Sequence, residues 1–111
     1  MQFNEYQVEA GQYAIYDHLL YPFLGLAEEA GEVVGKVAKR VRSHGDLWLQ
    51  PLNEFDAFRE AVSKELGDVL WQLQECCSVM GLNLDDVAEQ NLTKLLDRSW
   101  RNALSGEGDN R

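Results

Sequence analysis

The sequence predicts an all-α protein, and three observations support that class. Apolar side chains recur at the helical period of about 3.6 residues through several long segments. Residue types that begin and end helices stand at the borders of these segments. No segment alternates apolar and polar residues over several positions, as a half-buried strand does. We therefore expect four main helices packed as a bundle.

The first expected helix covers residues 5–20. Asn4 and Gln7 precede and open it with the spacing of a capping box, in which the two side chains satisfy free backbone N–H groups. Pro22 ends this segment, because proline is accommodated in the first turn of a new helix but not in a helix interior.

The second expected helix runs from Pro22 to about Ser43. Its apolar positions form one stripe, and Glu29 and Glu32 border a flank of that stripe. Positive charge gathers in its last turns, as the helix dipole favours, at Lys36, Lys39, Arg40 and Arg42. Residues 43–54, SHGDLWLQPLNE, have no sustained period and read as one long loop that could serve as a lid.

The third and longest expected helix, residues 57–80, organises the chain. Its apolar stripe is Phe58, Val62, Leu66, Val69, Leu73, Cys76 and Met80, continued upstream by Phe55. Glu65, Asp68 and Gln72 line one flank of that stripe. Gly81 is a suitable stop after this helix.

Asn83 is expected to cap a fourth helix, on which Asn91, Lys94 and Arg98 share one face. The chain up to residue 104 is expected to form one domain, followed by a disordered polar tail at 105–111.

The two acidic pairs are the strongest functional signal. Carboxylates three residues apart repel each other on a helix. Both pairs border apolar stripes, so we expect Glu29, Glu32, Glu65 and Asp68 to converge where the second and third helices pack, and to need cations there. Oxygen ligands alone favour a hard ion such as Mg²⁺. A diiron site would need Glu-x-x-His on two helices, and neither histidine has a glutamate three residues before it.

Glycines lie inside both pairs. Because Gly31 separates Glu29 from Glu32, and Gly67 separates Glu65 from Asp68, we expect a neighbouring helix or a phosphate to approach the backbone closely at both places. For each glycine, plain helix packing is the alternative.

Composition narrows the possible partners. The formal net charge of −9 argues against binding to nucleic acid or to an anionic membrane surface. Cys76 and Cys77 are adjacent, so a bridge between them is not expected. With no signal-peptide pattern at the N-terminus and no apolar run of membrane-spanning length, the expected location is the cytoplasm.

Three segments resemble the signature segments of the MazG-like nucleotide pyrophosphohydrolases, which belong to the all-α NTP pyrophosphatase superfamily. They are LGLAEEAGEVVGKV, KELGDVLWQLQ and NLTKLLDR, in the family's order. The resemblance implies an enzyme that hydrolyses nucleoside or deoxynucleoside triphosphates to the monophosphate and pyrophosphate, for nucleotide-pool control or house-cleaning. It also implies a four-helix fold completed by oligomerisation into a homodimer or homotetramer.

The resemblance also assigns residues. Metal ligands would be Glu29, Glu32, Glu65 and Asp68, binding Mg²⁺ or, as a substitute, Mn²⁺, and Glu29 or Glu32 would orient or deprotonate the attacking water. Contacts to substrate would come from Asn91, Lys94, Arg98 and Lys36. Compact members of this kind are frequent in phages.

Two other interpretations remain open at this point. One is a helical oligomer that binds nucleotide or metal without catalysis. The other is a structural dimerisation bundle whose carboxylates are simply solvated. Trp48 and Trp71 could stack on a base, although tryptophan on a helix more often belongs to a core or an interface.

Overall fold

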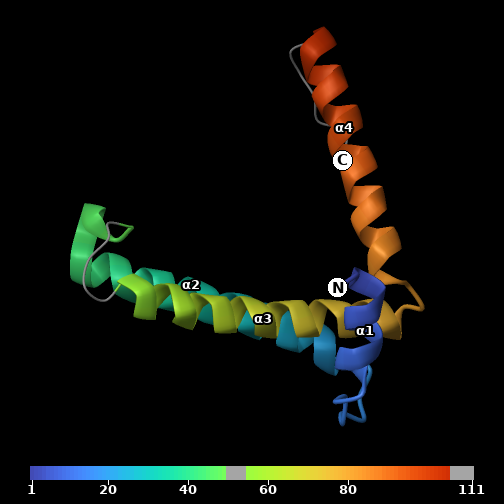
Figure 1. Ribbon diagram of the computed structural model, residues 1–111, viewed down its shortest axis with the longest axis horizontal. Helices are drawn as coiled ribbons and strands as arrows, with labels where there is room; N and C mark the ends of the chain where they lie inside the picture. Colours follow the sequence, from blue (N-terminus) through green and yellow to red (C-terminus); the bar gives the residue numbers. More distant parts are fainter. Residues whose placement is uncertain (50–54, 106–111) are drawn as a thin grey trace.

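The computed structural model describes residues 1–49 and 55–105, and the regular elements in this part of the chain are all helices. They are α1 (Phe3–Gly11), α2 (Tyr21–His44), the short 3₁₀ helix η1 (Gly45–Leu47), α3 (Phe55–Val79) and α4 (Leu84–Ser105), as Figure 1 shows. The predicted all-α class is confirmed.

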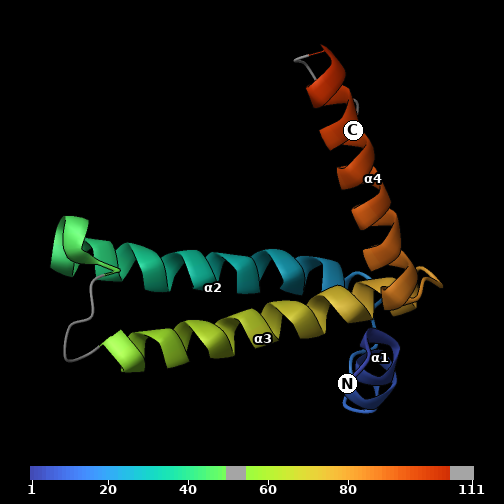
Figure 2. The ribbon, with the colours of Figure 1, turned by 45° about the horizontal axis from the view of Figure 1, so that its top comes forward.

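The centre of the fold is an antiparallel pair formed by α2 and α3, which lie side by side over most of their lengths (Figures 1 and 2). Both helices begin and end within two residues of the predicted borders. Gly81, at φ +70°, follows α3 as predicted, in the left-handed conformation that glycine adopts without a steric penalty. The long helical periods therefore located the two helices correctly.

The prediction for the first helix was wrong in its length. α1 ends at Gly11, and residues 12–20 form turns and irregular chain. Within this segment, Tyr16 contacts residues of α2 and α3. Tyr16 stacks on Tyr21, with ring centroids 5.3 Å apart, and its hydroxyl donates a 2.5 Å hydrogen bond to Glu75 of α3.

The predicted capping box at the start of α1 was also wrong. Asn4 lies inside α1, and its side-chain oxygen accepts a 3.0 Å hydrogen bond from the backbone N–H of Asp85, while Gln7 accepts one of 2.8 Å from Leu84. Asn83 accepts a third, of 2.9 Å, from the N–H of Asp86, as predicted. Side chains from α1 thus satisfy the free N–H groups at the start of α4 and tie the two helices together.

The second half of α3 buries polar side chains. Glu75 is only 3% exposed, and it accepts hydrogen bonds from Tyr16 and, at 2.8 Å, from the Gln74 amide. Burial and the hydrogen bond to Glu75 raise the pKa of Tyr16 to about 12. The protonated hydroxyl of Tyr16 is therefore part of the folded state.

Replacing Tyr16 with phenylalanine is expected to lower the free energy of unfolding at neutral pH by about 1.5 kcal/mol, because a buried carboxylate oxygen loses its donor. The folded-state pKa of Tyr16 lies above the ordinary value of 10, so its contribution is complete below pH 10 and is lost as the pH rises towards 12. Urea denaturation of both proteins between pH 7 and pH 11.5 measures this. A difference that does not shrink at high pH would contradict it.

α4 extends away from the α2–α3 pair and touches the rest of the chain near its first turns (Figures 1 and 2). The radius of gyration is accordingly 17.7 Å, against about 13 Å for a compact domain of 100 residues. Parts of the predicted buried stripe of α3 are exposed, namely Leu66, Leu73 and Met80. That part of the core prediction was wrong for the single chain, because α4 does not cover α3.

Two sequence predictions fall partly outside the described residues. Residues 43–54 were predicted to form one long loop that could serve as a lid, and the structure describes 43–49 of them. The loop prediction was wrong at its start, because α2 continues to His44 and η1 covers Gly45–Leu47, while the lid role stays a prediction. The tail is described only at Ser105, which is the last residue of α4. Among the described helices, none combines the length and the apolar character needed to cross a membrane.

Candidate metal and phosphate site

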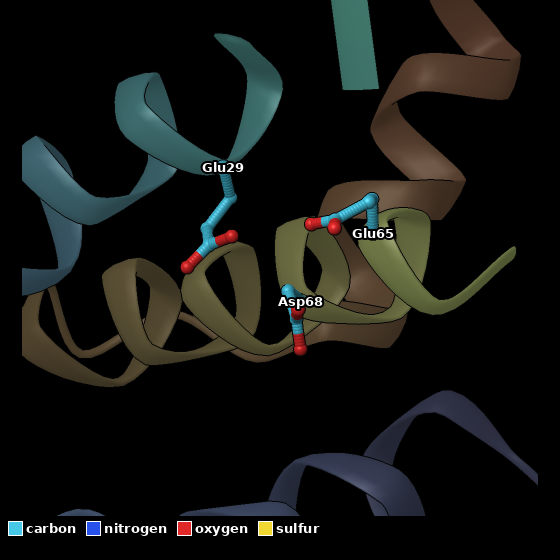
Figure 3. A group of neighbouring side chains, drawn as sticks. All are labelled: Glu29, Glu65 and Asp68. Carbon is cyan, nitrogen blue, oxygen red and sulfur yellow. The ribbon is translucent and has the colours of Figure 1, made fainter. Parts of the chain in front are cut away.

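Three carboxylates meet where α2 faces α3. Glu29 comes from α2, and Glu65 and Asp68 come from successive turns of α3 (Figure 3). One oxygen from each side chain lies within 4.8 Å of the other two. Glu29 and Glu65 are half-buried and Asp68 is exposed, so the group is open to solvent on one side.

This convergence follows from the helix period. Residues three apart lie on the same helical face, so Glu65 and Asp68 project together. Because α2 runs antiparallel to α3 alongside it, Glu29 reaches the same point from the opposite helix. The two acidic motifs were predicted to converge at this helix pair, and Glu29, Glu65 and Asp68 do so.

The environment of Glu29 disfavours its negative charge. Burial raises the pKa of Glu29 above its ordinary value, and the negative charges of Asp68, Glu32, Glu28 and Glu65 raise it further. A raised carboxyl pKa means that the anionic form is disfavoured at this position. A bound cation would remove that cost.

Glu32 does not join the group of three. It is exposed on the next turn of α2, and it acts on Glu29 through its charge. Lys36, one turn further along, lies 3.9 Å from Glu65. Lys36, a predicted substrate residue, thus lies beside the carboxylates, and its half-exposed side chain could also contact a phosphate.

No neighbouring helix of the described chain approaches the glycines within the acidic motifs, and the approach of a phosphate there stays a prediction. A Cβ added at Gly31 or at Gly67 would meet no described atom within 4 Å outside its own immediate backbone. The close approach occurs instead at Gly25, where an added Cβ would lie about 2.5 Å from the buried amide of Gln72.

Tyr6 is a neighbour of the site that the sequence did not indicate. Burial raises the pKa of Tyr6, and the charge of Asp68 raises it further, which places this α1 side chain near the carboxylate group. Tyr6 and Asp68 are 62 positions apart in the sequence, so no local spacing relates the two. Only the packing of α1 against α3 brings them together.

The three predicted substrate residues of the fourth helix lie elsewhere in the chain. Asn91, Lys94 and Arg98 are on α4, which projects away from the pair that carries the carboxylates (Figures 1 and 2). Asn91 and Lys94 are exposed and Arg98 is half-buried. Within one chain, α4 does not bring them to the acidic group.

The donor set fits a hard divalent cation. All three converging ligand atoms are carboxylate oxygens, and this group contains no histidine or cysteine. Mg²⁺ in proteins is commonly held by a few carboxylates, with water and substrate phosphates completing its octahedron. Three carboxylates open to solvent on one side leave room for such ligands.

Fold and site together define an all-α protein with an oxygen-only acidic centre across an antiparallel helix pair. A family model described as the MazG nucleotide pyrophosphohydrolase domain matches residues 21–101. The chain therefore belongs to the MazG nucleotide pyrophosphohydrolase family.

The comparisons also identify a phage relative. The chain is 33% identical, over 120 aligned positions that cover both chains completely, to the Gene 37 protein of Mycobacterium phage L5. That relative's name indicates no activity. No solved structure matches the chain.

Proposed function

We propose that this protein is a Mg²⁺-dependent pyrophosphohydrolase that converts nucleoside or deoxynucleoside triphosphates to the monophosphate and pyrophosphate. The observation that carries the proposal is the group of three carboxylate oxygens within 4.8 Å in a chain of the MazG family. The raised pKa of Glu29 supports it, because burial and the neighbouring negative charges disfavour the anionic form of Glu29, and a bound cation would offset this.

In this proposal Glu29, Glu65 and Asp68 hold Mg²⁺, for which Mn²⁺ can substitute, and Glu32 assists from the adjacent turn. The ion supplies charge neutralisation of the phosphates and activation of water. Water forms the new P–O bond, the α–β anhydride P–O bond breaks, and pyrophosphate leaves with the electron pair. Glu29 or Glu32 accepts the proton of the water.

Lys36 is proposed to bind the phosphate chain, because it is a half-exposed cation 3.9 Å from Glu65. Asn91, Lys94 and Arg98 can join the same centre only from another copy of the chain. We therefore propose that the enzyme is a homodimer or homotetramer in which α4 of one subunit approaches the α2–α3 pair of its neighbour.

The shape of the single chain supports assembly. The radius of gyration is 17.7 Å, and large apolar side chains are exposed along α4, including Leu92, Leu96 and Trp100, each more than 60% accessible. Contiguous apolar surface of this kind marks an interface in soluble proteins. Leu73 in α3 and Met80 just after it are exposed at the other end of the pair, away from η1, and give the partner a matching apolar surface.

The test is an assay of purified protein with each of the eight canonical NTPs and dNTPs and Mg²⁺, which resolves monophosphate, diphosphate, pyrophosphate and phosphate. Monophosphate and pyrophosphate in equal amounts are expected for at least one substrate. Release of orthophosphate and diphosphate instead would contradict the proposed bond cleavage. No turnover with Mg²⁺ or Mn²⁺, together with retained nucleotide binding, would favour the binding module.

A further inference from the structure

A second feature lies further along the same helix pair, at the end where η1 closes it. A cavity of about 680 Å³ opens there between the C-terminal half of α2, the N-terminal half of α3 and the residues after η1. Its walls are mainly apolar and aromatic, from Val37, Trp48, Leu49, Phe58, Val62 and Leu66. Its size and lining are typical of a small-molecule site.

The aromatic wall of this cavity is held in place by one arginine. The Nε of Arg40 donates a 3.1 Å hydrogen bond to the backbone oxygen of Trp48, and its guanidinium lies 5.1 Å from the centre of the Phe58 ring. Trp48 and Phe58 meet edge to face, with centroids 6.4 Å apart. Arg40 is 6% exposed, so it fixes the position of Trp48 from the interior rather than binding solute.

The cavity and the acidic centre are formed by neighbouring stretches of the same two helices. Its wall residue Leu66 directly follows Glu65, and Val37 directly follows Lys36, the cation beside Glu65. At about 1.5 Å rise per residue, Phe58 lies roughly 10 Å along α3 from Glu65. Phosphates at the carboxylates would therefore leave the remainder of a nucleotide to extend towards Trp48 and Phe58.

We propose that this cavity binds the nucleobase of the triphosphate, with Trp48 and Phe58 providing the aromatic contacts. The inference rests on the proposed function, because it requires the phosphates at Glu29, Glu65 and Asp68. A nucleobase is a flat ring with apolar faces and polar edges. The exposed Ser63 and Glu60, which also line the cavity, give those edges hydrogen-bonding partners, and the aromatic side chains of Trp48 and Phe58 suit the ring faces.

The experiment compares a ligand that has a base with one that has none. Calorimetric titration with Mg²⁺ measures the affinity for inorganic tripolyphosphate and for α,β-methylene analogues of ATP, GTP, CTP and UTP. In the native protein at least one analogue is expected to bind at least tenfold more tightly than tripolyphosphate. Trp48→Ala is expected to lower the affinity for that analogue about tenfold, because one stacking contact is lost. The affinity for tripolyphosphate should not change.

Three further variants separate base binding from structure. Trp48→Phe is expected to retain most of the affinity, since it keeps an aromatic face. Ser63→Leu fills the cavity from an exposed helical position and should produce the same selective loss. Leu47 is an exposed residue of η1 that does not line the cavity, so Leu47→Ala should leave the affinity for both ligands unchanged.

The outcomes distinguish the two proposals. If Trp48→Ala and Ser63→Leu lower the affinity for both ligands equally, or for neither, the proposal that the cavity binds the base is overturned. The proposed reaction is then unaffected. A change of oligomeric mass in these variants with native affinities would identify the cavity as a subunit interface instead. If native protein binds neither tripolyphosphate nor any analogue, the proposed function is overturned, and the inference with it.

Discussion

Replacing Glu65 with glutamine is expected to reduce triphosphate hydrolysis by about a thousandfold or more, because it replaces one of the three carboxylates of the proposed Mg²⁺ centre with a neutral amide. The same change should abolish thermal stabilisation by Mg²⁺, since an ion that binds only the folded state at free concentration c stabilises it by RT ln(1 + c/Kd), which vanishes when binding is lost. In metal-free buffer the stability should be unchanged or slightly higher, because one source of repulsion on Glu29 is gone.

The matched control is Glu9→Gln, which removes the same charge from an exposed position on α1 that is not part of the carboxylate group. Its activity and its response to Mg²⁺ should equal those of the native protein. Steady-state kinetics and thermal denaturation at several Mg²⁺ concentrations provide both readouts. Full activity in Glu65→Gln would refute the assignment of the centre. Lost activity with an intact Mg²⁺ response would mean that Glu65 contacts substrate rather than metal.

Replacing Gly25 with alanine is expected to lower the free energy of unfolding by about 2 kcal/mol. An added Cβ would lie about 2.5 Å from the amide of Gln72, which is 5% exposed and has little room to move. This clash outweighs the roughly 1 kcal/mol by which alanine favours a helix interior over glycine. The cost arises because the side chain of Gln72 fills the space beside Gly25 that a methyl group would need.

A double-mutant cycle tests this cause. Gly25→Ala combined with Gln72→Ala should be less destabilised than the sum of the two single changes, because the shortened side chain makes room for the methyl group. The control on the same helix is Gly31→Ala, which meets no described atom within 4 Å and should raise stability by up to about 1 kcal/mol. Urea denaturation of the four proteins and the control gives these values. Additive effects at positions 25 and 72 would contradict the packing that the structure shows.

The positions of α2, α3 and α4 were predictable because the signals for a helix are local. The apolar period, the proline at the start of α2, the cap at Asn83 and the glycine stop at 81 all act within one or two turns. The pairing of Glu65 with Asp68 was predictable for the same reason, since their spacing of three fixes them on one helical face. The acidic motifs and the family resemblance then indicated the chemistry of the centre.

The parts that local spacing could not reveal depend on contacts between distant segments. Asn4 and Gln7 match a capping box by sequence, yet they cap α4, because the start of α4 lies beside α1 in space. Helical spacing places Glu29 and Glu32 on the same flank of α2, and only the approach of α3 selects Glu29 for the group of three.

The sequence by itself determined an all-helical chain, the borders of its long helices and the acidic residues of its centre, because each depends on neighbours within a few turns. Tertiary structure alone decided the rest. It buried Glu75 against Tyr16, directed α4 away from the α2–α3 pair, and joined Arg40, Trp48 and Phe58 into the wall of a cavity. These features depend on the distances between elements, which the period of a single helix does not encode.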